Sequence, residues 1–173
     1  MVCAFTGHRP EQLSWGADER DARCAALKLQ LGRMVLRAFD AGCRTFLCGM
    51  ARGCDMYFAE QVLLARETHA QMRLVAMIPC PSQPAMWPAD ERARYDALVA
   101  ACDEVRVLEP SYSDGCMLRR NRAMVEAADV LITVFDGTPG GTAATVRYAG
   151  KLGCEIWPVW VWPGLAKPCI TPF

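Results

Sequence analysis

Short apolar runs alternate with longer amphipathic segments along this chain, and each apolar run ends in a cluster of Gly, Pro or Asp. Short runs rich in β-branched residues are typical of strands, whereas apolar positions that recur every three or four residues indicate a helix with one buried face. The pattern predicts strands over 2–6, 44–48, 74–78, 104–108, 130–135 and 156–161. It predicts helices over 18–40, 55–68, 90–101, 117–128 and 142–152.

The order of these segments predicts the fold class. Strands that alternate with helices imply right-handed βαβ crossovers and a parallel sheet covered on both faces. We therefore expect an α/β fold, a Rossmann-like three-layer αβα sandwich with a mostly parallel sheet, in one domain spanning 1–173. Gly42 is expected to end the first long helix. Pro158 indicates that the last strand lies at a sheet edge.

Composition and charge narrow the class of protein. Lys plus Arg and Asp plus Glu both count 19, so the net charge is zero, which argues against a dedicated nucleic-acid binder. No apolar run approaches the ~20 residues of a membrane span, and no signal peptide precedes the first strand, so we expect a cytoplasmic protein. The ten cysteines form no C-x-x-C pair and only two histidines accompany them. We therefore expect mostly buried, reduced thiols and no metal site.

Ligands of such sheets bind outside the carboxyl ends of the strands, so the loops after the first, second and fifth strands are the candidates. The first loop begins with Thr6 and Gly7. Because glycine has no side chain, the backbone at Gly7 can approach a ligand closely. His8 is either a general acid, a ligand contact or a solvated side chain. Arg9 carries donors suited to phosphate, or is simply an exposed arginine in a turn.

The second loop has the pattern G-x-x-x-G-x-D and enters a helix. Gly49, Met50 and Gly53 would leave backbone N–H groups free to face an anion at the helix N-terminus. The loop lacks the G-K-S/T of a Walker sequence. Asp55 either caps the helix or accepts hydrogen bonds from a ribose.

The third loop offers a similar cradle. It runs from Asp136 to the adjacent glycines Gly140 and Gly141 and into a helix that carries Thr142 and Thr145 on its apolar stripe. Hydroxyl groups one turn into a helix can reach a ligand at its start. The alternative is a flexible turn with an N-capping threonine.

The helix predicted over 117–128 carries Asn121 in its apolar stripe, with Arg120 beside it. A buried amide needs partners, since leaving it unsatisfied costs roughly 1–3 kcal/mol. Asn121 therefore either faces the ligand pocket or bonds to neighbouring backbone.

These segments together resemble one family in their order and spacing. The matching segments are T-G-H-R-P at 6–10, G-M-A-R-G-C-D at 49–55, Trp87 with Arg94 and Tyr95, R-N-x-x-M at 120–124, and G-G-T-x-x-T at 140–145. Over about residues 2–160 the chain is similar to the YpsA-like branch of the SLOG superfamily, which also contains the LOG phosphoribohydrolases and the DNA-processing protein DprA. The resemblance implies a Rossmann-like fold with a nucleotide pocket. It would be lined by Gly7, Arg9, Gly49, Gly53, Asp55, Arg120, Asn121 and 140–142.

One departure from the family pattern bears on activity. Thr145 stands where LOG enzymes carry a glutamate that takes part in cleaving the N-glycosidic bond. A threonine hydroxyl cannot replace a carboxylate as a general base or in stabilising an oxocarbenium-like centre. The LOG reaction is therefore in doubt for this chain.

The first functional hypothesis is accordingly a protein that binds a nucleotide or nucleotide-derived ligand, as a sensor in signalling or stress, with no cofactor and no assured catalysis. The second is an N-glycosidic hydrolase of nucleoside monophosphates that uses Asp55 or Asp136. The third is DprA-like binding of single-stranded DNA, against which the zero net charge counts. The tryptophan-rich end (Trp157, Trp160 and Trp162) either packs on the domain or forms a homodimer contact.

Overall fold

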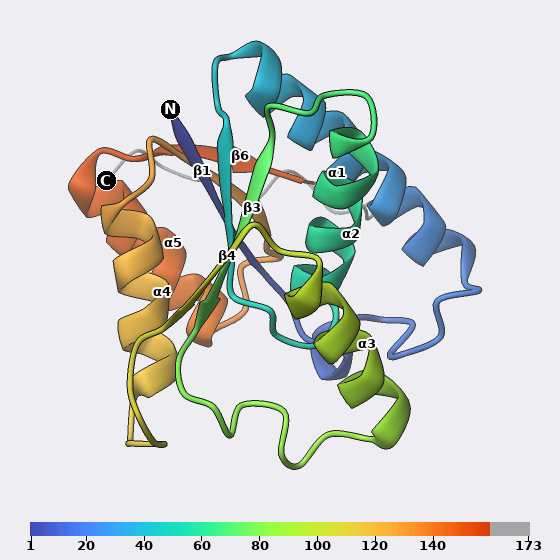
Figure 1. The fold of residues 1–173 in the computed structure, drawn as a ribbon, viewed down its shortest axis with the longest axis vertical. Coiled ribbons are helices and arrows are strands. Elements are labelled where there is room, and N and C mark those ends of the chain that lie inside the picture. Colours follow the sequence, from blue (N-terminus) through green and yellow to red (C-terminus); the bar gives the residue numbers. More distant parts are fainter. Residues whose placement is uncertain (160–173) are drawn as a thin grey trace.

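The computed structural model describes residues 1–159, which form a parallel sheet between two layers of helices (Figure 1). The sheet order is β4-β3-β2-β1-β5-β6, and each neighbouring pair is parallel. The strands are β1 (Val2–Gly7), β2 (Thr45–Cys48), β3 (Arg73–Ile78), β4 (Glu104–Val107), β5 (Val130–Val134) and β6 (Glu155–Pro158). The helices are α1 (Ala22–Asp40), α2 (Cys54–Arg66), α3 (Ala89–Ala100), α4 (Cys116–Glu126) and α5 (Gly141–Leu152), with a short 3-10 turn, η1 (Pro10–Gln12). The predicted Rossmann-like sandwich is confirmed.

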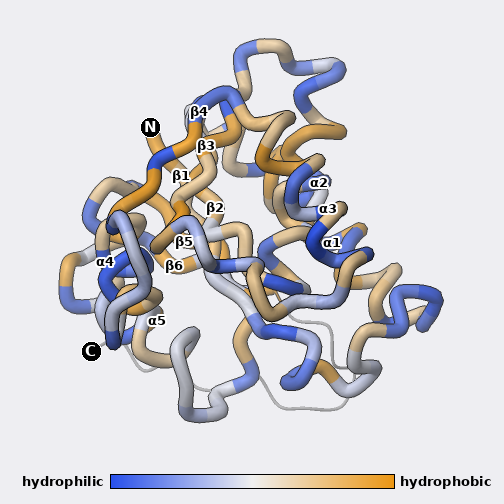
Figure 2. The backbone as a smooth tube through the Cα atoms, turned by 60° about the horizontal axis from the view of Figure 1, so that its bottom comes forward, coloured by the Kyte–Doolittle hydropathy of each residue, from blue (hydrophilic) through white to orange (hydrophobic). Residues whose placement is uncertain are grey.

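Each face of the sheet has its own apolar core, because successive side chains of a strand point to opposite faces. Phe5 of β1 stacks on Phe58 of α2 with ring centroids 4.5 Å apart, on the side of α1 to α3. Its neighbour Ala4 packs on the other side with Leu131 of β5 and Met124 of α4. The strands therefore form the apolar centre of the tube in Figure 2, with hydrophilic segments around them.

The strand order reverses between β1 and β5. Strands β1 to β4 follow one another outward, and the chain then crosses back so that β5 lies on the free side of β1. Helices α1, α2 and α3 accordingly cover one face, and α4 and α5 cover the other (Figure 1). At such a switch point the connections on either side diverge and leave a crevice at the carboxyl ends of the strands.

Most predicted boundaries hold to within one or two residues, and α1 is the exception. It begins at Ala22 rather than at residue 18, because Asp21 caps it: the Asp21 carboxylate accepts a hydrogen bond from the Arg23 amide at 2.8 Å. The turn η1 was not predicted. Gly42 follows the end of α1 with φ +103, in the left-handed region that favours glycine, and Pro158 lies in the edge strand β6, so both of these expectations are confirmed.

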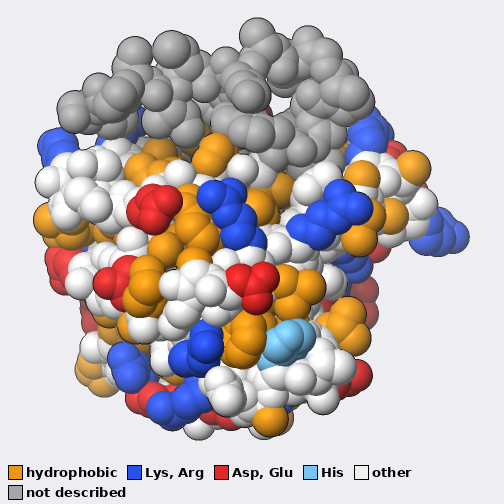
Figure 3. Space-filling model, turned by 90° about the horizontal axis from the view of Figure 1, so that it is seen from above, with side chains coloured by type: hydrophobic (Ala, Val, Ile, Leu, Met, Phe, Trp, Pro, Cys, Tyr) orange, Lys and Arg blue, Asp and Glu red, His pale blue; other side chains and the backbone are white. Residues whose placement is uncertain are grey.

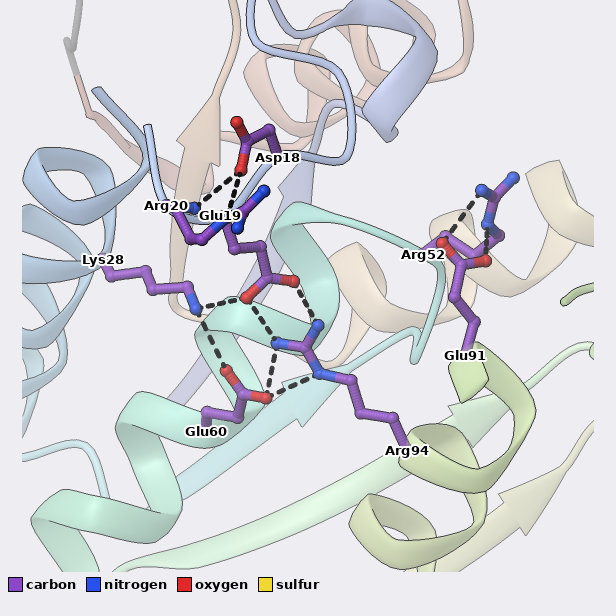
Figure 4. Close-up of polar contacts among 8 residues, drawn as sticks. All are labelled: Asp18, Glu19, Arg20, Lys28, Arg52, Glu60, Glu91 and Arg94. Carbon is purple, nitrogen blue, oxygen red and sulfur yellow. Dashed lines mark hydrogen bonds and ion pairs between the residues drawn. The ribbon is translucent and has the colours of Figure 1, made fainter. Parts of the chain in front are cut away.

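A network of ion pairs ties the connection between β1 and α1 to two other helices (Figure 4). Glu19, in this connection, pairs with Arg94 of α3 and with Lys28 of α1. Arg94 also donates from Nε to Glu60 of α2 at 2.7 Å. Arg94, part of the segment that carries the family resemblance, thus serves the scaffold. The network holds the part of this connection next to α1 in place.

Nine of the ten cysteines lie in residues 1–159, all as free thiols, and seven of these are buried, as predicted. Trp157 is buried, with the Arg37 guanidinium 4.1 Å from the centre of its ring, so its packing on the domain is confirmed. Trp160, Trp162 and Cys169, and the end of the strand predicted over 156–161, lie outside the described residues. Within 1–159 no helix combines the length and apolar character needed to cross a membrane.

Candidate functional site

A cavity of about 480 Å³ opens at the carboxyl end of β1, beside the point where the strand order reverses. Its wall comes from the end of β1 and the loop after it, the loop before α4, the first two turns of α4, the first turn of α5, and two residues near the start of α2. Nine of the fifteen residues predicted from the sequence line it: Thr6, Gly7, Arg9, Asp55, Arg120, Asn121, Gly140, Gly141 and Thr142. Segments far apart in the chain thus meet in one cavity.

Two arginines contribute positive charge to this wall. Arg9 is exposed, whereas Arg120 is only 3% exposed and donates from Nη1 to the carbonyl oxygens of Gly49 and of Met77, the latter at 3.0 Å. A Cβ atom on Gly49 would meet that same Nη1 atom, so a larger residue here would displace the guanidinium that crosses the backbone. Burial lowers the pKa of Arg120, and the nearby Asp55 carboxylate opposes this shift. A buried guanidinium at a cavity wall is well suited to an anionic ligand.

The start of α5 is the second part of the wall with donors suited to an anion. Gly140 is the N-cap and Gly141 the first helical residue, and both line the cavity. The first N–H groups of a helix have no intrahelical acceptor and carry the positive end of its dipole. One interpretation of the sequence made Thr142 the N-cap of this helix, and that is wrong. The Thr142 hydroxyl instead donates to the Gly7 carbonyl at 3.2 Å and joins α5 to the end of β1.

Asp55 is the one carboxylate among the residues lining the cavity. It lies one residue into α2, whose N-cap is Gly53, so Asp55 is not the cap. Its Oδ2 atom instead accepts from the Ala51 amide at 3.1 Å. Burial raises the pKa of Asp55 above that of an ordinary aspartate, opposed by Arg120, the Ala51 amide and Arg9.

The second predicted cradle does not open into this cavity. Gly49, Met50 and Gly53 are buried and absent from its wall. Two amides in or next to this loop have acceptors inside the protein: the Cys54 N–H donates to the His8 carbonyl at 3.2 Å, and the Ala51 N–H donates to Asp55. The Gln83 amide group covers the carbonyl oxygens of Gly49 and Met50, each at 3.1 Å. This loop supports the site through Asp55 and Arg120 rather than through free amides.

Three further predicted residues lie behind the wall. His8 is 1% exposed, and its Nε2 atom lies 2.9 Å from Oδ1 of Asp136. Thr145 is 2% exposed; its hydroxyl donates to the Gly141 carbonyl at 2.8 Å and accepts from the Asn121 amide at 2.9 Å. These residues hold the loops that form the cavity.

Arg120, not Asn121, is the more deeply buried member of its pair. Asn121 is half-buried, and both ends of its amide bond to side chains: Oδ1 accepts from Arg120 Nε at 2.8 Å, and Nδ2 donates to Thr145. Neither sequence interpretation named these partners. Asn121 fixes the direction of the buried guanidinium.

The cavity wall also includes residues that sequence reasoning missed. They are Phe5, Gln12, Ala51, Tyr112, Gly115, Cys116, Met117, Leu118 and Ala144. Tyr112 and Gly115 belong to the loop after β4, which a reading confined to the loops after strands one, two and five passes over. Their signal in the sequence was an aromatic residue in a loop, three residues before a glycine at a helix start. Within 1–159, no three His, Cys, Asp or Glu side chains converge as a metal ion requires.

Comparison with known protein families assigns the chain to one of them. The sequence model of the YpsA family, described as the YspA SLOG family, matches residues 3–149. The chain belongs to this family. The match covers both the loop after β1 and most of α5, so the family region includes the segments that form the cavity.

Similar proteins include members from bacilli. The chain is 25% identical over 126 residues to the SPbeta prophage-derived protein YoqJ of Bacillus subtilis, covering 65% of this chain and 74% of that protein. It is 25% identical over 154 residues to the UPF0398 protein BH1768 of Halalkalibacterium halodurans, covering 87% and 80% respectively. Both matches extend over most of the described domain.

Two solved structures share the fold. DNA processing protein A from Helicobacter pylori, solved in work on its single-stranded DNA binding mode, superposes with a TM-score of 0.61 at 16% identity, over 91% of this chain and 64% of that one. DprA from Streptococcus pneumoniae gives a TM-score of 0.63 at 14% identity, over 91% and 49%. The chain therefore spans less than two thirds of each DprA chain, and the likeness shows the fold.

Proposed function

We propose that this SLOG-family protein binds a phosphate-bearing nucleotide or nucleotide-derived ligand in the cavity at the carboxyl end of β1. The observation that carries the proposal is the meeting of Arg9, the buried Arg120 and the start of α5 in one wall. Guanidinium groups and the free amides of a helix N-terminus are donors that phosphate groups use. A volume of about 480 Å³ lies in the range of small-molecule sites.

The proposal is tested by thermal unfolding against a panel of nucleotides. A ligand that binds the native state alone stabilises it by about 2.7 kcal/mol at a hundredfold excess over its dissociation constant, so at least one nucleotide should raise the melting temperature clearly. Adenosine or guanosine without phosphate should have little effect, because both arginines and the α5 amides would lack their partner. A panel without any stabilising nucleotide would count against the proposal.

Binding of single-stranded DNA is the second candidate, favoured by the DprA fold likeness and by the DNA binding stated for the Helicobacter pylori protein. This likeness weighs against the expectation, drawn from zero net charge, that nucleic acid is not a ligand. Figure 3 shows the face at the amino ends of the strands, away from the cavity, and there Lys and Arg side chains lie among acidic and apolar ones. Anisotropy of a labelled oligonucleotide at several salt concentrations tests it, because log affinity should fall with log salt by about 0.7 per phosphate neutralised.

Hydrolysis of an N-glycosidic bond is the third candidate, favoured by Asp55 facing the cavity with a raised pKa. Asp136, the other carboxylate considered from the sequence, is outside the wall. Incubation with nucleoside monophosphates, followed by chromatography for the released base, tests this reaction. Product formed by the wild type and lost in Asp55→Asn would support it, whereas binding without product supports a sensor of a signalling nucleotide.

A further inference from the structure

The cavity wall has a second chemical character, which the proposed phosphate contacts do not use. The loop before α4 and the first turn of α4 contribute Tyr112, Cys116, Met117 and Leu118. Apart from the tyrosine hydroxyl, this part of the wall is apolar. A phosphate or a bare sugar phosphate would leave it without a matching group, whereas a planar nucleobase has apolar faces of the kind that stack on an aromatic ring.

Tyr112 is the most exposed aromatic side chain of this wall, at 63% exposure. Within residues 1–159 its ring has no aromatic or cationic partner. Phe5, the other aromatic residue of the wall, is 1% exposed and already stacks on Phe58. Tyr112 is therefore the side chain with a ring face open to a ligand.

The loop that carries Tyr112 is braced on both sides of it. Arg119 of α4 donates from Nε to Oε1 of Glu109 at 2.7 Å and from Nη1 to the Asp114 carbonyl at 2.9 Å. The Ser113 hydroxyl bonds to both Glu109 and Arg119. A loop fixed before binding loses less conformational entropy when a ligand arrives, so the brace favours a preformed stacking surface.

We infer that Tyr112 is the base-stacking residue of the site and that the ligand class is a nucleoside monophosphate. This inference rests on the proposed function. The phosphate lies against Arg9, Arg120 and the start of α5, and the base stacks on Tyr112. One phosphate matches the charge of the wall best, because two guanidinium groups face the ligand and Asp55 offsets part of their charge. A triphosphate would bring additional negative charge without further cations to meet it.

Titration calorimetry on the full chain tests the inference with AMP, GMP, CMP, UMP, ATP and ribose 5-phosphate. We expect at least one nucleoside monophosphate to bind roughly tenfold or more tightly than ribose 5-phosphate, in line with the known worth of base–aromatic stacking. It should also bind more tightly than ATP. Tyr112→Ala should remove the advantage over ribose 5-phosphate and leave the affinity for ribose 5-phosphate unchanged. Tyr112→Phe should keep nucleotide affinity within about twofold, because the ring remains.

Tyr148→Phe is the matched control, since this tyrosine bonds to Glu126 and is absent from the cavity wall. It should leave every affinity unchanged. If the monophosphates bind but Tyr112→Ala binds them as tightly as the wild type, or ribose 5-phosphate equals them, the inference is wrong and the proposed phosphate site stands. If neither nucleotides nor ribose 5-phosphate bind the wild type, both are wrong.

Discussion

His8 and Asp136 lie 128 residues apart in the chain, and their side chains meet at 2.9 Å behind the candidate site. His8 belongs to the loop after β1, and Asp136 follows β5, the strand that lies beside β1. The contact joins the two loops that flank the point where the strand order reverses. The loops after β1 and β5 are therefore held together next to the cavity.

Asp136 should contribute stability that depends on pH. Burial would raise its pKa, but the amide and hydroxyl of Thr138 and the ring of His8 outweigh that effect, so the pKa lies below that of an ordinary aspartate. A carboxyl group with a lowered folded pKa stabilises the protein above its unfolded pKa of ~3.9 and loses this contribution as the pH falls through the folded value.

Asp136→Asn should therefore unfold more easily at pH 7, by roughly 1.5–3 kcal/mol, the usual worth of hydrogen bonds to a charged group. The difference from the wild type should shrink toward pH 3. Urea unfolding followed by circular dichroism between pH 3 and 7 measures it. Asp96→Asn, an exposed aspartate of α3, should be neutral. A destabilisation by Asp136→Asn that is the same at every pH would contradict the assignment.

Two glycine substitutions should distinguish a glycine needed for stability from one needed only for ligand binding. Gly49→Ala would place a Cβ atom against the Arg120 guanidinium, and we expect it to destabilise the protein by roughly 1–3 kcal/mol, since the hydrogen bonds to Gly49 and Met77 must shift. A Cβ atom on Gly141 meets nothing within 4 Å. Gly141→Ala should leave stability unchanged or raised by about 0.4–1 kcal/mol.

Nucleotide affinity should fall in both glycine variants, but for different reasons. In Gly141→Ala the methyl group would stand among the amides at the start of α5, and in Gly49→Ala the arginine would be displaced. Urea unfolding and titration calorimetry on both proteins provide the comparison. Equal stability of the two variants would show that the crossing of Arg120 over Gly49 is not a tight contact.

The sequence predicted the sheet well because each strand has a local pattern of apolar residues that identifies it without the others. All five residues of β5, from Val130 to Val134, are buried, as a continuous apolar run predicts for a strand covered on both faces. The loops after β1 and β5 were predicted for a related reason: a glycine at the end of a buried strand, or soon after it, indicates a turn or a close approach of the backbone to a ligand.

The remaining errors come from information that exists only in three dimensions. Nothing local shows that Arg120 is buried, because arginine is usually exposed and its partners are carbonyl groups of Gly49 and Met77. The sequence likewise does not show that the backbone of His8 accepts a hydrogen bond from the Cys54 amide, at the end of the second loop. Tyr112 lines the cavity because the chain crosses back over the sheet toward β1 through α4. The strand order produces this crossing.

Asp55 should cost the unliganded protein stability near neutral pH. Its folded pKa is raised, chiefly by burial, so the stability linked to it is fully present below the unfolded pKa of ~3.9 and is lost as the pH rises through the folded value. Asp55→Asn removes the titration while keeping an oxygen that can accept from the Ala51 amide.

The free energy of unfolding of Asp55→Asn should therefore improve relative to the wild type between pH 4 and pH 7. The hydrogen bonds that Asp55 would accept from a ribose should weaken in this variant, and this loss of ligand affinity should exceed the gain from removing a negative charge near the phosphate. A residue that costs stability and serves binding is typical of a functional site. Urea unfolding at both pH values, with calorimetry at pH 7, checks this. A difference in stability that does not change with pH would show that the pKa of Asp55 is not raised in the folded protein.

Arg9 offers the most direct test of the phosphate contact, because it lines the cavity and yet is exposed, so its removal should not disturb folding. A charge-assisted hydrogen bond is worth about 1.5–3 kcal/mol, and Arg9→Ala should weaken nucleotide binding by roughly tenfold to a hundredfold. The melting temperature without ligand should match the wild type, and the shift caused by a stabilising nucleotide should be mostly lost. Arg20→Ala is the matched control, because Arg20 is exposed and pairs only with Asp18 in residues 1–159. If the two variants respond to nucleotide alike, the phosphate does not lie against the loop after β1.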